Sequence, residues 1–301
     1  MIETIAVVGV GLMGTSLARH LLAAGYGVVV HDLDAGKVDA LVAEGAKKLA
    51  RPEDIAAETD IIMLSLPNSH IVNDVVRNTL KLCDGRKKAT VLVDTSTPDP
   101  EMSAALAAEL TEHGIEMLDA TISGTSEMFA EKDAIFLVGG KEDVFDACKP
   151  IFLAASNDAF YMGAGGAGAV MKLVTNLVLT LNRMALAEGL TLARKAGLDA
   201  SQALAVLKKS AAYSRAMDQK GERMVQKKFL PPASRLASSY KDARLMLALG
   251  ARLDCPLPLM SFTVQAMASE ICKGHQDRDP ATMISFYNEL AGLERSGGKS
   301  A

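Results

Sequence analysis

The chain has no tryptophan, and phenylalanine and tyrosine together make up only 4% of its 301 residues. Stacking surfaces for sugars and nucleobases are built from such side chains, so neither kind of binding platform is expected. The net charge is −4 and the chain carries no basic block. Nucleic acid and membrane surfaces are therefore not expected as partners.

Cysteine is equally scarce. The four cysteines are far apart and form no Cys-x-x-Cys pair: Cys83, Cys148, Cys255 and Cys272. We therefore expect no zinc site, find no other metal-ligand spacing, and favour a reducing, cytoplasmic compartment. Met1 runs almost directly into the first apolar run, so no signal peptide is expected.

A glycine-rich turn is the strongest motif present. Residues 9–14 read Gly-Val-Gly-Leu-Met-Gly between an apolar run and a helical pattern. Gly9 makes the tight turn, Gly11 lets the backbone approach a pyrophosphate, and Gly14 lets the helix pack closely. The helix N-terminus supplies N–H groups for the phosphates. This pattern predicts a dinucleotide-binding unit.

Asp32 closes the second apolar run and bears on which dinucleotide binds. A carboxylate accepts hydrogen bonds from a ribose 2′-hydroxyl but repels a 2′-phosphate, and the next residue is Leu33 rather than arginine. We therefore expect NAD in preference to NADP. The alternative interpretation of Asp32 is a turn-forming aspartate.

Short apolar runs alternate with amphipathic stretches through residue 162. The runs predict strands over 5–8, 28–31, 61–66, 91–94, 117–119, 135–138 and 160–162. Helical patterns lie between them, for instance over 100–112 and 142–148. This alternation predicts an α/β domain with a Rossmann-type doubly wound sheet and right-handed crossovers.

The pattern changes at the glycine-rich stretch 163–168, after which no strand is expected. A long interdomain helix is predicted over about 168–195, roughly 40 Å in length, with further helices near 203–209, 235–251, 258–273 and 280–293. The predicted domains are thus 1–162, binding a dinucleotide, and an all-α domain over 163–301. The tail 296–301 is expected to be disordered.

The long helix carries polar residues, so it is expected to be a buried helix of a soluble protein. Its apolar face is larger than one helical domain needs, which predicts a homodimer or homotetramer. Lys172 and Asn176 share one of its faces. Burial would lower the pKa of such a lysine and suit it to acid–base catalysis, although a snorkelling surface lysine is the alternative.

Two polar segments directly follow predicted strands. Residues 94–98, Asp-Thr-Ser-Thr-Pro, would place hydroxyls beside a nicotinamide ribose or a substrate, unless they only cap a helix. Residues 119–126 include a Ser-Gly turn that suits a carboxylate, unless it is an ordinary polar loop. Tyr240-Lys241-Asp242, later in the chain, is by itself only a charged helix face.

These motifs, in this order and spacing, resemble the β-hydroxyacid dehydrogenase family over residues 5–292. The Ser65-Leu66-Pro67 turn adds to the resemblance. The resemblance implies that the cofactor is bound by Gly9, Gly11, Leu12, Met13, Gly14, Asp32, Leu66, Pro67, Ser96, Thr97 and Lys241. It also implies that Ser123 and Gly124 hold a substrate carboxylate, that Lys172 is the general acid/base, and that Asn176 orients the reacting oxygen. The implied activity is NAD-dependent hydride transfer to or from a small 3-hydroxy acid.

The chain departs from the family pattern at three positions. Thr125 and Thr175 replace a usual glycine and asparagine near the substrate, and Ala243 replaces a leucine. We therefore expect Thr125 to contact an atypical substrate. Two alternatives stay open, namely an imine reductase of the same fold and a non-catalytic NAD-binding sensor or scaffold. Lys172 argues against the imine reductase, and Lys172 together with Asn176 argues against the sensor or scaffold.

Overall fold

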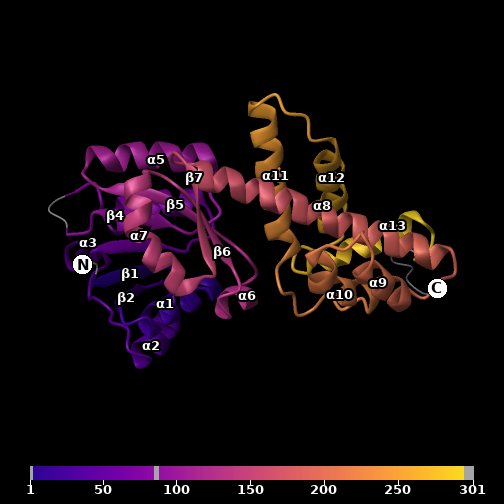
Figure 1. Cartoon of the computed structure of the whole chain (residues 1–301), viewed down its shortest axis with the longest axis horizontal. Coiled ribbons are helices and arrows are strands. Elements are labelled where there is room, and N and C mark those ends of the chain that lie inside the picture. The colour runs from indigo at the N-terminus through magenta and orange to yellow at the C-terminus, as the bar shows by residue number, and fades with distance from the viewer. Residues whose placement is uncertain (1–2, 85–87, 295–301) are drawn as a thin grey trace. The chain divides into compact units, whose positions relative to one another are not determined.

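The computed structural model describes residues 3–84 and 88–294, so the predicted disordered tail lies outside the described residues. The chain divides into two compact units, 1–172 and 173–301 (Figure 1). This division falls inside the long helix α8 (Ala167–Lys195) rather than at residue 162, where the sequence pattern places it. The first unit holds a seven-stranded sheet, and the described part of the second holds helices without a strand.

All seven predicted strands are present. They are β1 (Thr4–Val8), β2 (Gly27–His31), β3 (Ile61–Leu64), β4 (Val91–Asp94), β5 (Glu116–Ser123), β6 (Ile135–Gly139) and β7 (Asp158–Gly163). Their order across the sheet is β2-β1-β3-β4-β5-β6-β7. The order changes direction between β1 and β3, and open α/β sheets bind ligands at the carboxyl ends of the strands at such a point.

The strands β5 and β6 are antiparallel, whereas every other neighbouring pair is parallel. Only residues 124–134 join β5 to β6, and they include the short helix α6 (Ser126–Ala130). A parallel crossover needs a dozen or more residues, so the chain turns back alongside β5 instead. The sheet is therefore mostly, but not wholly, parallel.

The other helices of the first unit are α1 (Leu12–Ala23), α2 (Ala35–Ala43), α3 (Ile55–Glu58), α4 (Ser69–Asp74), α5 (Pro100–Glu112) and α7 (Glu142–Ala155). Those of the second unit, beyond α8, are α9 (Ala200–Lys209), α10 (Glu222–Val225), α11 (Leu236–Arg252), α12 (Pro258–Cys272) and α13 (Met283–Leu290). Short 3-10 or π turns lie at Pro52–Asp54, Val75–Thr79, Met217–Gly221 and Pro280–Thr282.

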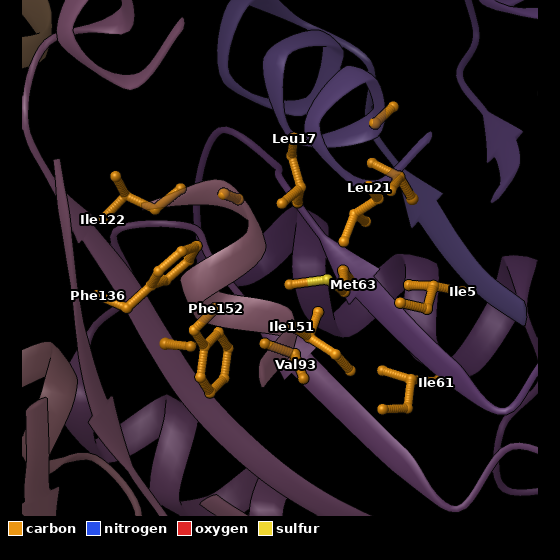
Figure 2. Close-up of a cluster of buried hydrophobic side chains, with 14 of the residues drawn as sticks. Ile5, Leu17, Leu21, Ile61, Met63, Val93, Ile122, Phe136, Ile151 and Phe152 are labelled. Carbon is orange, nitrogen blue, oxygen red and sulfur yellow. The ribbon is translucent and has the colours of Figure 1, made fainter. Parts of the chain in front are cut away.

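Side chains of the central strands alternate between two hydrophobic cores. Figure 2 shows one of them, a cluster that includes Ile5 and Met63 of the strands, Leu17 of α1 and Phe152 of α7. The intervening strand residues, such as Ala6, Val8 and Leu64, belong to a second core with Val72 of α4 and Leu106 of α5. Helices thus cover both faces of the sheet, which explains why the strands read as continuous apolar runs.

The helix α7 is longer than predicted. It runs through Pro150, whereas the sequence pattern ends it at Cys148. Proline inside a helix costs about 3 kcal/mol because it removes an N–H and crowds the preceding turn. Beyond the proline, Ile151 and Phe152 are buried in the first core, and each gains about 1.5–3 kcal/mol from burial. Tertiary packing therefore outweighs the local signal.

The second unit has its own core, to which α8 contributes Leu186 and Leu190 and α11 contributes Leu236 and Met246. Among the described residues, α8 alone is long and apolar enough to cross a bilayer by length and composition, and 33% of its most apolar stretch is buried. A core helix of a soluble protein passes the same test.

Candidate active site

The glycine-rich loop joins β1 to α1 in the geometry that the motif predicts. Gly9 has a φ of +90°, and a Cβ there would overlap the carbonyl oxygen of Ser65. A Cβ on Gly14 would overlap the carbonyl oxygen of Gly9. Gly11 is the N-cap of α1 and has no side chain to occupy the first-turn amides. These amides suit a pyrophosphate, since no described residue lies within 4 Å of a Cβ built on Gly11.

Asp32 directly follows β2 and braces this loop. Its Oδ2 accepts a hydrogen bond from Val10 N at 2.7 Å, and its Oδ1 accepts one from Asp34 N at 2.9 Å. Asp32 therefore does form a turn, but each carboxylate oxygen has a second lone pair with which to accept from a ribose hydroxyl. Leu12 and Leu33 beside it are 75% and 99% exposed. The residues present thus fit a dinucleotide.

Ser96 ties the loop after β4 to the loop after β3. Its Oγ accepts from Leu66 N at 3.0 Å, and its own N–H donates to Asp94 Oδ1 at 2.9 Å. The capping alternative for this segment is wrong, because Asp99 caps α5 by accepting from Glu101 N and Met102 N. Ser96 is buried, which leaves half-buried Thr97 as the more accessible of the two predicted cofactor contacts.

Two buried carboxyl groups lie on neighbouring strands, Asp94 at the end of β4 and Asp119 within β5. Asp94 and Asp119 are register partners, with exposures of 0% and 1%. Burial raises the pKa of Asp94 to about 6, against the hydrogen bond from Ser96 and with help from the charge of Asp119. Burial also raises the pKa of Asp119, although backbone N–H groups at Gly166 and Ala169 oppose it. The sequence analysis gave neither aspartate a role.

Lys172 is buried beside the predicted substrate loop. It is 7% exposed, and its Nζ donates to the carbonyl oxygen of Ile122 at 2.6 Å. The next residue, Ser123, ends β5 and begins the Ser-Gly turn. A snorkelling lysine would reach solvent, so that alternative is wrong. The first unit therefore brings the amine of Lys172 next to the Ser123-Gly124 turn.

Thr125 has a local structural role that the sequence analysis missed. Its Oγ1 accepts from Met128 N at 3.2 Å and so caps the short helix α6. The Thr-x-x-Met spacing after a strand could have revealed this cap. The hydroxyl of Thr125 is therefore held toward α6, while Ser123 and Gly124 precede it in the turn.

In the second unit, Asp242 holds Asn176 and Lys241. Asn176 Nδ2 donates to Asp242 Oδ2 at 3.3 Å, and Lys241 Nζ lies 3.3 Å from Asp242 Oδ1. The amide of Asn176 is thereby oriented, with its NH₂ group toward the carboxylate. Asn176 and Lys241 stand out in the sequence, but Asp242 as their common partner does not, because 66 residues separate Asn176 from Asp242.

Comparison with known proteins agrees with this geometry. Residues 4–163 match the family described as the NAD binding domain of 6-phosphogluconate dehydrogenase. Residues 166–287 match the family described as NAD-binding of NADP-dependent 3-hydroxyisobutyrate dehydrogenase. The chain is 32% identical to 2-(hydroxymethyl)glutarate dehydrogenase of Eubacterium barkeri, covering 98% of both chains.

Solved structures show the same likeness. The 3-hydroxyisobutyrate dehydrogenase of Mycobacterium tuberculosis, solved with L-serine, superposes with a TM-score of 0.85 at 27% identity, covering 95% of this chain and 99% of that one. An imine reductase of Streptomyces aurantiacus gives a TM-score of 0.63 at 22% identity, over 97% of this chain and 100% of that one, a likeness of fold alone.

One similar protein has a different printed name. The cytokine-like nuclear factor N-PAC of Xenopus tropicalis is 31% identical over 95% of this chain, but this chain spans only 53% of that protein. Fold, glycine-rich loop and relatives together define an NAD(P)-dependent dehydrogenase of small hydroxy acids. The chain belongs to the β-hydroxyacid dehydrogenase family.

Proposed function

We propose that this dehydrogenase acts on a small 3-hydroxy acid, prefers NAD, and uses Lys172 as its general acid/base. The observation that carries the proposal is the hydrogen bond from buried Lys172 Nζ to Ile122 O, directly before Ser123. It places a proton donor and acceptor next to a turn whose N–H groups and hydroxyl suit a carboxylate.

Different residues have different roles in the proposed reaction. When bound, the cofactor supplies hydride transfer at its nicotinamide ring. In oxidation, neutral Lys172 takes the proton of the substrate hydroxyl, and in reduction its ammonium returns that proton to the forming alkoxide. The Ser123-Gly124 turn holds the substrate carboxylate. Asn176, oriented by Asp242, positions the reacting oxygen.

The test is NADH formation from NAD with a panel of 3-hydroxy acids. The panel holds 3-hydroxyisobutyrate, 3-hydroxypropionate, glycerate, serine, threonate and 2-(hydroxymethyl)glutarate. Lys172→Ala should lower kcat by about 10²–10⁴-fold on the accepted acid. Lys141→Ala is the matched control, because Lys141 is an exposed lysine paired with Glu116 in the same unit. Full activity of Lys172→Ala would refute the assigned base.

The NAD preference rests on Asp32 and Leu33. A 2′-phosphate brought to Asp32 would meet a carboxylate, and exposed Leu33 offers it no cation. We expect kcat/KM to be at least about tenfold higher with NAD than with NADP. Asp32→Asn should lower the ratio of kcat/KM with NAD to kcat/KM with NADP, while it keeps an acceptor for Val10 N. Equal use of both cofactors by the wild type would contradict the preference.

We also propose that the chain forms a homo-oligomer through α8. Three large apolar side chains on this helix are exposed, with Val174 at 45%, Val178 at 52% and Leu192 at 70%. Burying such side chains against a second copy gains about 25 cal/mol per Å² of apolar surface. Light scattering coupled to gel filtration, run at micromolar concentration, measures the assembly directly.

A further inference from the structure

The start of α8 is tied to β5 at two alternate residues of that strand. Asp119 Oδ1 accepts from Gly166 N and Asp119 Oδ2 accepts from Ala169 N, both at 2.7 Å. Two residues further along β5, Thr121 Oγ1 donates to Gly168 O at 3.2 Å. These contacts fix where the helix begins.

The contact between this helix end and the strand is close. A Cβ on Gly168 would overlap the carbonyl oxygens of Asp119 and Leu137, so the helix backbone lies directly on the sheet. Asp119 and Thr121 are both buried, with exposures of 1% and 0%. Water therefore cannot replace their hydrogen bonds at low cost, and any change at either residue acts on the helix itself.

The same strand and the same helix carry the reacting groups. Lys172 lies about one turn beyond Gly168 on α8 and donates to Ile122 O of β5. Ser123 is the next strand residue. Asp119 and Thr121 fix how α8 is aligned along β5. That alignment also sets where Lys172 Nζ lies relative to the Ser123-Gly124 turn.

We propose that Asp119 and Thr121 are positioning residues for the reaction, which act by fixing the register of α8 against β5 and thereby the place of Lys172. The inference rests on the proposed role of Lys172. Neither residue needs to touch substrate or cofactor. An error of about 1 Å in the place of a catalytic group can cost about 10²-fold in rate, so loss of the register should appear in kcat.

The first test is Asp119→Asn. Asparagine keeps the size of the side chain but offers one acceptor oxygen, and its NH₂ group would face one of the two helix N–H groups. We expect kcat to fall about 10- to 100-fold. The dissociation constant for NADH, measured by fluorescence, should stay within about twofold of the wild-type value, because the glycine-rich loop is untouched.

A matched control separates positioning from general damage. Asp60 Oδ2 accepts from Glu3 N and Thr4 N, both at 2.9 Å, in the same unit, and Asp60 also pairs with Lys88. Asp60→Asn therefore changes a carboxylate that accepts from two backbone N–H groups without changing α8. It should leave kcat within about twofold of wild type, whatever its effect on Tm.

The decisive measurement is a double-mutant cycle. If Asp119 acts through Lys172, adding Asp119→Asn to Lys172→Ala should cause no further loss of kcat, whereas a merely structural role would lower both backgrounds. Full activity of Asp119→Asn beside an inactive Lys172→Ala would overturn this inference alone. Full activity of Lys172→Ala would instead overturn the proposed function.

If Asp119→Asn does not fold, two milder variants at Thr121 test the same inference. Thr121→Val removes the hydroxyl, which donates to Gly168 O at 3.2 Å and has a weaker second acceptor in Leu137 O at 3.5 Å, and Thr121→Ser retains it. We expect kcat to fall about threefold or more in the valine variant, which is the lower end of the effect of one lost hydrogen bond, with recovery in the serine variant. Equal kcat in both would overturn the inference.

Discussion

Asp94 and Asp119 are direct register partners on the parallel strands β4 and β5, and their two carboxyl groups are both buried. Asp119 accepts hydrogen bonds from the first turn of α8. Asp94 accepts one from Ser96 N, and its Oδ2 has no hydrogen-bond partner among the described residues. Burial raises the pKa of both carboxyl groups, and Asp94 has fewer hydrogen bonds to offset it than Asp119 has.

The free energy of unfolding should consequently fall as the pH rises from 3.8 to about 6, between the unfolded and folded pKa values of Asp94. Its pKa is raised from 3.8 to about 6, so the folded protein binds the proton more tightly than the unfolded chain between these values. The loss is complete above about pH 6 and is on the order of 3 kcal/mol. Asp94→Asn should remove it, because asparagine keeps an acceptor for Ser96 N.

Urea unfolding at pH 5 and pH 8 checks this prediction. Asp94→Asn should gain stability over wild type at pH 8 and only about half as much at pH 5, because pH 5 lies midway between the unfolded and folded pKa values of Asp94. Asp39→Asn is the control, because Asp39 is exposed and paired only with Lys48. Equal shifts for Asp94→Asn at both pH values would contradict a titrating Asp94.

Thr125→Gly should change substrate preference at little cost in stability. Replacing a threonine N-cap by glycine costs only a few tenths of a kcal/mol in stability. The change also removes the hydroxyl and methyl groups of the side chain next to Gly124. Removing a methyl-sized contact from a pocket is worth about 10–200-fold in discrimination. The ratio of kcat/KM between a bulky and a small 3-hydroxy acid measures this discrimination. An unchanged ratio, equal to that of Ser126→Ala, would show that Thr125 only caps α6.

Lys220→Met should strongly destabilise the second unit. Lys220 Nζ lies 2.7 Å from Asp279 Oδ2, and the two side chains are 2% and 0% exposed. Removing the lysine leaves a buried unpaired charge, at a cost of about 3–5 kcal/mol. Adding Asp279→Asn should recover part of the loss. Denaturant unfolding measures both, and Lys48→Met, at an exposed ion pair, should cost less than about 1 kcal/mol.

Val178→Asp should dissociate the proposed oligomer. Val178 is 52% exposed on α8, and a carboxylate there could not be buried against a second copy without a large desolvation cost. Light scattering should report a lower mass for this variant than for wild type. Val206→Asp, at a 67% exposed valine of α9, should leave the mass unchanged. A wild-type monomer would refute the oligomer.

Much of the first unit could be predicted because its signals are local. The turn at residues 9–14 and the apolar runs of the strands both depend on residues close in sequence. The lysine and the Ser-Gly turn could also be identified, since both interrupt patterns that would otherwise be apolar or featureless. Their roles came from the order of several motifs rather than from any single residue.

Other features depend on pairs of residues that are distant in sequence. Thr125 could be seen to differ from the family pattern, but its capping of α6 required the local backbone. The anchoring of α8 by Asp119 spans 47 to 50 residues, and the pairing of Asn176 with Asp242 spans 66. Such contacts follow from strand register and helix packing, which no local pattern encodes.

The sequence by itself determined the kinds of elements, the dinucleotide turn and the chemical groups available for catalysis, because propensity, periodicity and turn geometry act over a few residues. The tertiary structure decided the antiparallel return of β6, the continuation of α7 through Pro150, the burial of Lys172 and the pairing of Asp94 with Asp119. Each of these balances a local cost against burial or hydrogen bonds supplied by distant residues, and that balance exists only once the chain has folded.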